Sequence, residues 1–485
     1  MRQRQRQHLR TTIATTASAA LVGGLILATG GGAAAAPAGT PGDFNGDGYR
    51  DLAIGAPLGK AGGKAKAGYV AVVYGTKNGL DKSRRTIISQ ATEGIPGTPE
   101  SGDYFGDRLT TGDLDGDGYT DLVVGVHSER IGSTDSYGVL TVVWGGPKGL
   151  KSGVDLASPL PEYRNELGWG VAAGDFDGDG RTDLAALNNS MPTLNIFKGP
   201  VSRSGKAAGR TNIDTDNETG VSAAGIFAGN VNGDGATDLL VMGQQSSGDN
   251  YLTRSVLYKG GKSGLKSAGK VAGGYEAAIA DVDKDGFGDI ITGNFMEKSA
   301  DEPNGGPGGA ITVTYGSAAG LSTRTPVRIT QDTAKVPGTA AKGDRFGWSV
   351  SAGDTNGDGY ADVAIGAIGE ATGSLRATGT VTVLRGSRGG LTGTGAKSFT
   401  QNTAGVPGTA EAHDQFGAAV RLMDSDRNGR AELVVGAYAE NDGAGSVWLF
   451  PSDKSGVTAT GSTSFGAAQV GGAAGLSYFG QVLAG

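Results

Sequence analysis

Residues 112–126, GDLDGDGYTDLVVGV, place four aspartates two to four residues apart, directly before a run of β-forming residues. In a bare loop Asp113, Asp115, Asp117 and Asp121 would repel one another. A Ca²⁺ ion takes roughly six to eight oxygen ligands, and carboxylates on alternate residues of a tight turn supply several of them from one short segment. A bound cation would therefore relieve the repulsion, provided that this stretch is more than a solvated loop.

The same nine-residue pattern occurs seven times, at intervals of 51 to 73 residues. Position 6, where the chain must turn sharply, is glycine in every copy. Positions 1, 3, 5 and 9 would offer side-chain oxygens and position 7 a backbone carbonyl. The candidate ligands are Asp43, Asn45, Asp47, Tyr49, Asp51; Asp113, Asp115, Asp117, Tyr119, Asp121; Asp175, Asp177, Asp179, Arg181, Asp183; Asn230, Asn232, Asp234, Ala236, Asp238; Asp281, Asp283, Asp285, Phe287, Asp289; Asp354, Asn356, Asp358, Tyr360, Asp362; and Asp424, Asp426, Asn428, Arg430, Glu432.

Other uses of such a loop fit less well. An EF-hand needs a bidentate glutamate at position 12, which is Val124 in the second copy and Ile365 in the sixth. Short tandem calcium repeats are excluded because the spacing between copies is far too long. The remaining alternative is a metal-free turn rich in Asp and Asn, and seven copies with the same glycine favour the cation.

Ligand charge should rank the loops, because it tunes calcium affinity. The copies from Asp113, Asp175 and Asp281 carry four carboxylates, whereas those from residues 43, 354 and 424 carry three. The copy from Asn230 has only two, Asp234 and Asp238. We expect up to seven Ca²⁺ sites, with the Asn230 loop and the Arg-crowded Asp424 loop binding most weakly or staying empty.

Each loop leads into strand-like segments that must position it. Short apolar runs, such as LAIGAP from Leu52 and YVAVVYG from Tyr69, alternate with glycine-rich turns, about four strands to a unit. A Phe-Gly pair precedes several loops, with Phe105, Phe346 and Phe416 each eight residues ahead of the first aspartate. Four short strands in a unit of this length are typical of a propeller blade.

These repeats resemble the FG-GAP family, whose best-known members are the integrin α-subunit head domains. The likeness is to a secreted bacterial type, runs from residue 41 onward and is weakest in the units of Asn230 and Asp281. It implies an all-β, seven-bladed β-propeller with four-stranded antiparallel blades over residues 37–485.

The two ends of the chain predict how the ring closes. By the eight-residue spacing the first unit should have Phe-Gly at Ala35 and Ala36, and it does not. The chain instead finishes with YFGQVLAG, a Phe-Gly strand without a loop after it. We expect this last strand to complete the first blade, because closure removes exposed strand edges.

Residues 1–36 have the pattern of a cleaved secretory signal: four arginines, a short apolar stretch and a small-residue run. A membrane anchor is the alternative, but no later segment could span a bilayer. Losing the four arginines moves the net charge from −7 to −11, which argues against a nucleic-acid partner. The chain has no cysteine, so an exported, monomeric protein would need cross-links other than disulfides, and metal ions are one candidate.

No catalytic constellation stands out, since His127 and His413 belong to no recognisable triad. We therefore favour a binding or adhesion module with an extracellular protein or glycan ligand, although integrin heads act with a partner subunit. The alternative is an extracellular hydrolase or an accessory part of one. Similar repeats occur in glycosylphosphatidylinositol-specific phospholipase D, whose catalytic part is a separate N-terminal domain, and the short segment before the first loop leaves no room for one.

Two features could form a contact surface. The polar segment 295–309 is the longest insertion between two strands, and loops on propeller faces carry recognition. Trp144, Trp348 and Trp448 lie at strand positions that predict packing inside blades, with a binding face as the alternative.

Overall fold

The computed structural model describes residues 40–485, apart from segments 132–136, 157–165, 190–192, 248–249 and 301. The expected signal, residues 1–36, lies outside the described residues. Within the described part of the chain, no helix has the length and apolar character needed to cross a membrane.

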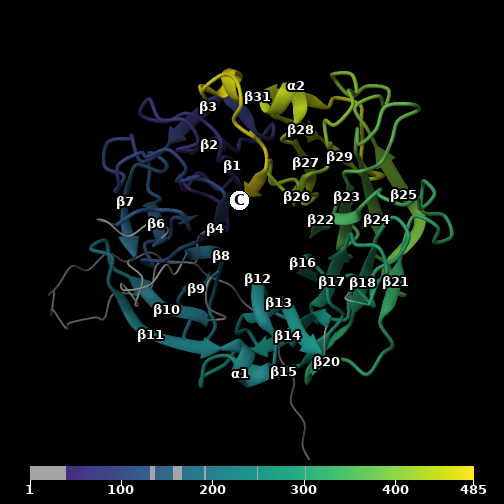
Figure 1. Cartoon of the computed structure of the whole chain (residues 1–485), viewed down its shortest axis with the longest axis horizontal. Helices are drawn as coiled ribbons and strands as arrows, with labels where there is room; N and C mark the ends of the chain where they lie inside the picture. Colours follow the sequence, from purple (N-terminus) through teal and green to yellow (C-terminus); the bar gives the residue numbers. More distant parts are fainter. Residues whose placement is uncertain (1–39, 132–136, 157–165, 190–192, 248–249, 301) are drawn as a thin grey trace, which may run out of the picture. The chain divides into compact units, whose positions relative to one another are not determined.

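Seven four-stranded antiparallel sheets stand around a central opening (Figure 1), as the repeat predicts. Blade one pairs β3 (Asp81–Ile88), β2 (Tyr69–Tyr74), β1 (Leu52–Ala56) and β32 (Val482–Ala484). Blade two contains β4 (Arg108–Gly112), β5 (Asp121–Val126), β6 (Val139–Trp144) and β7 (Ser152–Leu156). Blade three contains β8 (Leu167–Gly174), β9 (Asp183–Asn188), β10 (Thr193–Val201) and β11 (Ala207–Asp214). Blade four contains β12 (Ser222–Gly229), β13 (Asp238–Ser247), β14 (Asn250–Lys259) and β15 (Lys266–Val271).

Blade five contains β16 (Glu276–Ala280), β17 (Asp289–Asn294), β18 (Ala310–Thr314) and β21 (Val327–Ile329). Blade six contains β22 (Phe346–Gly353), β23 (Asp362–Ala367), β24 (Thr380–Arg385) and β25 (Thr392–Phe399). Blade seven contains β26 (Ala419–Met423), β27 (Glu432–Ala437), β28 (Ser446–Phe450) and β31 (Thr463–Gly466). Two small ribbons pair β19 (Gly316–Ser317) with β20 (Gly320–Leu321) and β29 (Ser452–Asp453) with β30 (Gly456–Val457). The short helices are α1 (Thr215–Thr219), α2 (Glu440–Gly443) and the 3₁₀ helix η1 (Ala467–Val470).

Burial within each blade explains the apolar runs that follow the loops. Every residue of β5, DLVVGV, is buried, and so is every residue of β23. Neighbouring blades cover both faces of these strands, so they read as continuous apolar runs rather than as alternating ones. The outer strand β3, DKSRRTII, is largely exposed and correspondingly polar.

The Phe-Gly pairs join consecutive blades. Phe105 is fully buried and packs with Val70 of the preceding blade. The backbone of Gly68 forms a β-bridge with Phe105, and a Cβ on Gly68 would lie 2.2 Å from the Phe105 carbonyl oxygen. The same bridge joins Gly309 to Phe346 and Gly379 to Phe416. Each phenylalanine therefore fixes one blade against the next.

Closure of the ring confirms the prediction from the chain ends. β32 pairs antiparallel with β1 and supplies the first blade with its innermost strand. Phe479 of the final Phe-Gly pair is fully buried and packs with Phe465 of blade seven, with ring centroids 6.0 Å apart. The last residues of the chain therefore join blades one and seven.

Candidate cation loops and the central channel

All seven acidic loops lie at one end of the ring. In six blades the loop connects the innermost strand to the second strand, as residues 113–120 connect β4 to β5. In blade one the loop leads into β1, whose inner neighbour β32 comes from the end of the chain. Because the blades share one strand order, these connections fall on the same face. The structure thus places all the predicted ligand sets in equivalent positions.

Position 1 organises the loop backbone. Asp113 Oδ1 accepts the Gly116 N–H at 2.8 Å, and Asp113 Oδ2 accepts the Gly118 N–H at 2.9 Å. The equivalent bonds recur in the loops from Asp43, Asp175 and Asp354. The glycine at position 6 has a φ of 81° to 91° in all seven loops, in the left-handed region that glycine adopts without strain. The sharp turn expected at this position is confirmed.

Position 9 is a buried anchor as well as a candidate ligand. Asp121 is fully buried, and its two oxygens accept the N–H groups of Leu114 and Gly145, both at 2.8 Å. Six loops share this arrangement, in which one bond comes from loop position 2 and the other from a glycine near the end of the third strand or just after it. The anchors are Asp51, Asp121, Asp183, Asp238, Asp289 and Asp362. In the seventh, Glu432 accepts only from Ser425.

Burial makes a negative charge at position 9 unfavourable without a cation. Desolvation raises the pKa of Asp121 to about 8, while its two backbone hydrogen bonds act in the opposite direction. Desolvation likewise raises the pKa of Asp51 and of Asp289 to about 7. Neighbouring aspartates of the same loops raise these pKa values further, so the loops concentrate negative charge where water is scarce.

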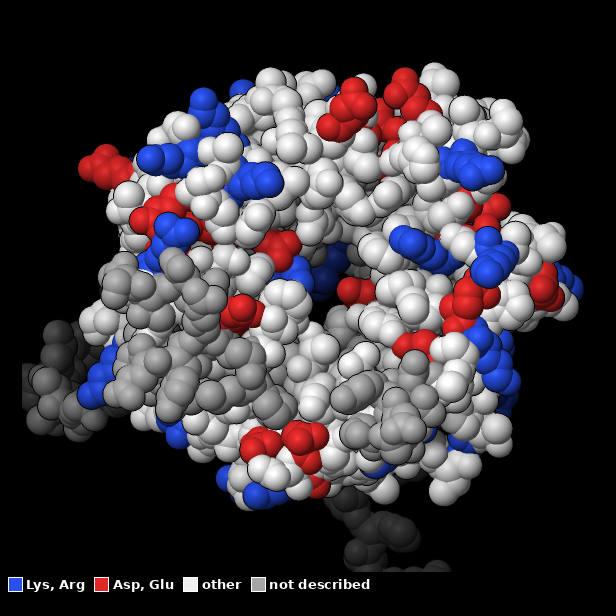
Figure 2. Space-filling model, viewed as in Figure 1, with Lys and Arg blue, Asp and Glu red and all other residues white. Residues whose placement is uncertain are grey.

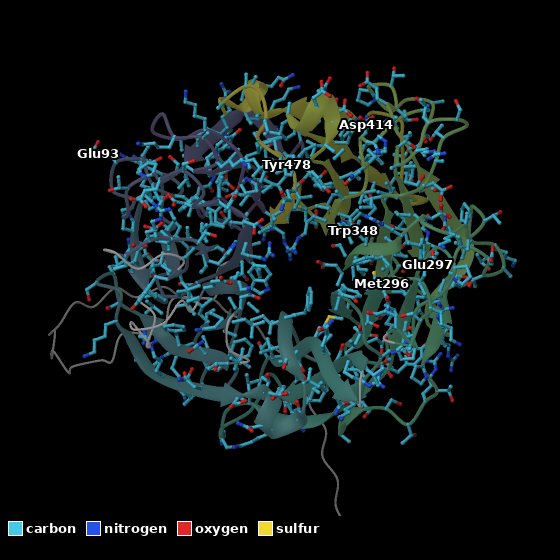
Figure 3. The ribbon with its side chains drawn as sticks, in the orientation of Figure 1. Glu93, Met296, Glu297, Trp348, Asp414 and Tyr478 are labelled. Atoms are coloured by element: carbon cyan, nitrogen blue, oxygen red, sulfur yellow. The ribbon has the colours of Figure 1, made fainter. Side chains whose placement is uncertain are left out.

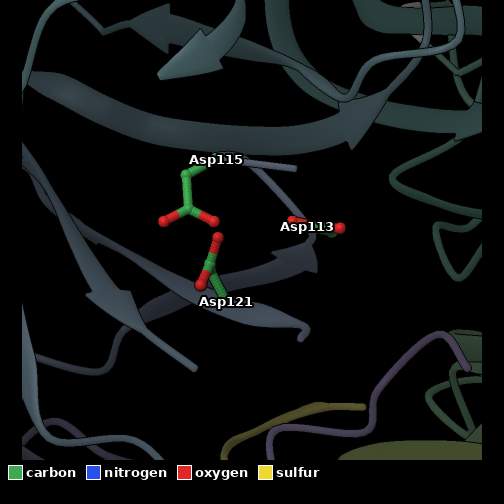
Figure 4. Close-up of side chains that lie close together, drawn as sticks. All are labelled: Asp113, Asp115 and Asp121. Atoms are coloured by element: carbon green, nitrogen blue, oxygen red, sulfur yellow. The ribbon is translucent and has the colours of Figure 1, made fainter. Parts of the chain in front are cut away.

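In four loops three acidic groups converge. The sets are Asp113, Asp115 and Asp121; Asp175, Asp177 and Asp183; Asp281, Asp283 and Asp285; and Asp424, Asp426 and Glu432, each offering oxygens within 4.8 Å of one another. Figure 4 shows the carboxylates of Asp115 and Asp121 turned toward each other, with Asp113 beside them. The loops from Asp43, Asn230 and Asp354 have asparagine at position 3, and its amide N–H donates to the position 5 carboxylate.

Three of these convergent sets hold an oxygen that lacks a hydrogen bond. Asp177 Oδ1, Asp283 Oδ1 and Glu432 Oε1 are buried and have no hydrogen-bond partner among the described residues. A buried carboxylate oxygen without a partner costs free energy, and a cation within the cluster would satisfy it. The donor set, all oxygen and mostly charged, suits a hard cation such as Ca²⁺.

Basic side chains from elsewhere in the propeller reach five of the loops. The Arg203 guanidinium lies 2.8 Å from both Asp115 and Asp117 and packs over the Trp144 ring at 5.3 Å. Further ion pairs are Arg84–Asp47, Lys198–Asp177, Arg324–Asp283 and Arg385–Asp362, at 2.7 to 3.0 Å. Sequence reasoning missed these pairs because the partners lie 21 to 88 residues away, and no local spacing reveals them.

The arginines of the last loop lie against neighbouring loops. The Arg427 guanidinium lies beside Gly48 of the first loop, and the Arg430 side chain lies beside Gly357 of the sixth. The three acidic groups of the Asp424 loop converge despite these neighbours. The position 7 N–H donates to the position 5 side chain in all seven loops.

The innermost strands surround a central channel. The channel has its mouth on the face of the propeller opposite the acidic loops. A cavity of about 600 Å³ occupies this mouth. It is lined by the residues two positions after the Phe-Gly phenylalanine or its equivalent: Gln481, Asp107, Trp169, Ala224, Tyr275, Trp348 and Ala418. Figure 2 shows the hollow at the centre of the ring, with acidic and basic side chains at its rim.

The sequence left two roles open for the tryptophans, packing inside a blade or lining a binding face, and the structure shows both. Trp144 and Trp448 are buried within blades, as expected. Trp348 instead lines the channel mouth, where its ring packs against Phe295 with centroids 4.6 Å apart. Phe295 begins the predicted contact segment 295–309, so that segment contributes to the mouth. Its middle is folded inward, with Glu302 buried and accepting a hydrogen bond from Asn294 at 3.2 Å.

Comparisons with known proteins agree with this architecture. The FG-GAP repeat model matches residues 35–73 and 346–384, and the FG-GAP-like repeat model matches residues 113–186. Phosphatidylinositol-glycan-specific phospholipase D of Rattus norvegicus is 34% identical over 151 residues, which are 31% of this chain and 18% of that protein. Integrin alpha-5 of Xenopus laevis is 41% identical over 85 residues, 17% of this chain and 7% of that protein.

The chain therefore spans about a fifth or less of the length of these curated relatives. Among solved structures, the exotype rhamnogalacturonan lyase YesX is similar with a TM-score of 0.44 and 15% identity, covering 87% of this chain and 72% of that chain. The chain therefore contains FG-GAP repeats, and it folds as a seven-bladed β-propeller.

Proposed function

We propose that this protein is an exported binding module whose propeller is stabilised by Ca²⁺ ions in its acidic loops. The observation that carries the calcium assignment is the set of buried, unpartnered oxygens on Asp177, Asp283 and Glu432, each inside a convergent acidic cluster. In each loop the oxygens of positions 1, 3, 5 and 9, with the position 7 carbonyl, would hold the ion. Its charge would compensate the buried carboxylates and cross-link two strands of the blade.

The loops are expected to differ in affinity. Those from Asp113, Asp175 and Asp281 combine four carboxylates with convergent oxygens, so they should fill first. The loop from Asn230 has two carboxylates and should fill last. The Asp424 loop should bind calcium, since its acidic groups converge and its arginines lie toward neighbouring loops.

The binding role is supported by the opposite face. That face carries the long connections between the second and third strands and the aromatic mouth of the channel. Ca²⁺ at the far end would hold the blades rigid without competing for a ligand there. Similarity to integrin alpha-5 supports a role in recognition, and the arginine-rich, then apolar pattern of residues 1–36 supports export. The ligand would be an extracellular protein or glycan, bound by a single chain.

A second candidate function is favoured by the similarity to phosphatidylinositol-glycan-specific phospholipase D. In that case the propeller would be an accessory part of a hydrolase, or a hydrolase itself. Incubating the purified chain with a phosphatidylinositol-glycan substrate and measuring release of the lipid distinguishes the two. Turnover by the chain would favour the enzyme.

Thermal unfolding tests the calcium proposal. An ion that binds only the folded state stabilises it by RT ln(1 + [L]/Kd), about 2.7 kcal/mol per site at a concentration 100 times Kd. We expect a much higher melting temperature in calcium than in excess chelator. Asp283→Asn should reduce the difference, whereas Glu93→Gln, which removes an exposed charge outside the loops, should not (Figure 3 labels Glu93). Superimposable melting curves in calcium and chelator would refute the proposal.

A further inference from the structure

The mouth of the channel is a built surface rather than an incidental gap. Three of the seven ring residues two positions after Phe-Gly are aromatic: Trp169, Tyr275 and Trp348. Adjacent connections add Phe295, Tyr438 and Tyr478 to the cavity lining. All six are half-buried. Apolar ring faces grouped in one concavity of a protein surface mark a ligand site.

The aromatic rings form two walls. Phe295 packs between Tyr275 and Trp348, with centroids at 4.7 and 4.6 Å and tilted planes. Tyr438 and Tyr478 form a second pair, 4.9 Å apart. Figure 3 shows Trp348 and Tyr478 beside the central opening. Ring-to-ring contacts, together with the Arg345 guanidinium over the Trp348 ring at 5.5 Å, hold these side chains in place before any ligand arrives.

Polar groups stand between the walls. Glu276 lines the cavity and has no hydrogen-bond partner among the described residues, so its oxygens are available to a ligand. Asp107 accepts hydrogen bonds from Arg108 and from Gln481, both at 2.9 Å, and the Arg108 guanidinium also covers the Trp169 ring at 5.3 Å. Carboxylate, guanidinium and amide groups beside flat apolar faces can bind a molecule that has both hydroxyl groups and apolar faces.

The charged side chains that line the cavity indicate which class of ligand it can bind. Among the described residues, two acids, Asp107 and Glu276, and two arginines, Arg108 and Arg421, line this cavity. The lining thus holds acids and arginines in equal number, with no excess of either charged type to select an anion or a cation. The cavity volume of about 600 Å³ lies within the range of roughly 300–1,000 Å³ that is usual for small-ligand sites.

We propose that the channel mouth binds a neutral saccharide, such as the end of a glycan chain. Pyranose rings would place their C–H faces on the walls containing Trp348 and Tyr478, while ring hydroxyls would bond to Glu276 and Arg108. The inference rests on the proposed binding function and assigns the ligand class and the site. It places calcium at the opposite end of the channel, where the ion supports the fold and takes no part in sugar contact.

The test uses the full chain at saturating calcium on an array of neutral, anionic and cationic oligosaccharides, followed by calorimetric titration with the best neutral binder. Trp348→Ala and Glu276→Gln should each weaken that binding about tenfold or more. Trp348→Phe, which keeps a flat apolar face, should retain most of the affinity, and Val327→Ala, at an exposed site on β21, should leave it unchanged. The melting temperature of each variant in calcium shows whether it is folded.

Several results would overturn the saccharide assignment. One is that no neutral oligosaccharide on the array binds. Another is that a neutral oligosaccharide still binds to both the Trp348→Ala and the Glu276→Gln variant when these are folded. A third is capture of a lysine- or arginine-rich peptide instead, lost on Glu276→Gln, which would assign the mouth to a protein partner. A calcium-dependent melting temperature alongside any of these results would leave the calcium proposal intact, so the two failures are distinguishable.

Discussion

Ala53 of β1 lies opposite Ala484 of β32, near the end of the chain, and this pairing closes the propeller. Deletion of residues 477–485 would leave the inner edge of β1 unpaired and empty the site of Phe479, a fully buried side chain. Exposed strand edges pair with other chains, so the truncated protein should aggregate or fail to be secreted. Size-exclusion chromatography of secreted protein measures this, with Gln481→Ala as a control that keeps the strand. A monomeric truncation of unchanged stability would contradict closure by β32.

Position 9 should matter even without calcium. Asp121→Ala leaves the buried N–H groups of Leu114 and Gly145 without acceptors, at a cost of about 1–3 kcal/mol each. Asp115→Ala removes a candidate ligand that pairs with the exposed Arg203 guanidinium and accepts a hydrogen bond from the Asp117 N–H. In chelator we expect the first variant to unfold at clearly lower urea concentration than the second. Equal midpoints in chelator would mean that the position 9 anchor contributes nothing beyond ion binding.

Repetition explains how much could be predicted from the sequence. The period, the glycine at position 6 and the Phe-Gly spacing determine the blades, and the incomplete first unit predicts its closure by Phe479 and the residues after it. Position 9 was predicted as a ligand only, because its bond to Gly145 joins residues that come together only when the third strand folds back. Arg203 approaches Asp115 from the neighbouring blade, so the contact depends on how blades pack.

The residues of the channel mouth share one position in the repeat, which the individual motifs do not reveal. Trp169 and Trp348 each lie two residues after a Phe-Gly position, and Tyr275 has the same register once Gly273 is taken as the equivalent of phenylalanine. Alignment of the seven units on their loops, rather than on Phe-Gly, reveals the ring of seven residues. The packing of Phe295 between Tyr275 and Trp348 has no such signal, because it depends on the path of a long connection.

Calcium stoichiometry should follow ligand charge. Asp117→Ala removes one of four carboxylates from a loop expected to fill early, so the number of ions bound at modest calcium should fall by about one. Asp234→Ala changes the Asn230 loop, where only Asp238 would remain, and the count should barely change because this loop fills last. A calcium titration with a fluorescent chelator measures both. The opposite order would show that loop rigidity rather than charge sets affinity.

The buried Gln90–Glu129 pair should make stability depend on pH. Desolvation is the main cause that raises the pKa of Glu129 to about 7, against a hydrogen bond that Gln90 Nε2 donates at 2.7 Å. Nearby carboxyl groups, chiefly Asp103, raise it further. Between the ordinary value of 4.5 and about 7 the folded state therefore holds a proton that the unfolded state has lost, and stability falls as pH rises through this window.

Glu129→Gln removes the titrating group and keeps a similar shape. The unfolding free energy of the variant, relative to that of the wild type, should therefore increase as pH rises from about 4.5 to about 7. Above about pH 7 this difference should stay constant. Urea unfolding of both proteins at equal, saturating calcium measures the difference and cancels the pH dependence of ion binding. Glu93→Gln, at an exposed site, should follow the wild type at every pH. If Glu129→Gln also follows the wild type throughout, Glu129 is ionised in the folded protein across this range, and its pair with Gln90 stabilises the charged form.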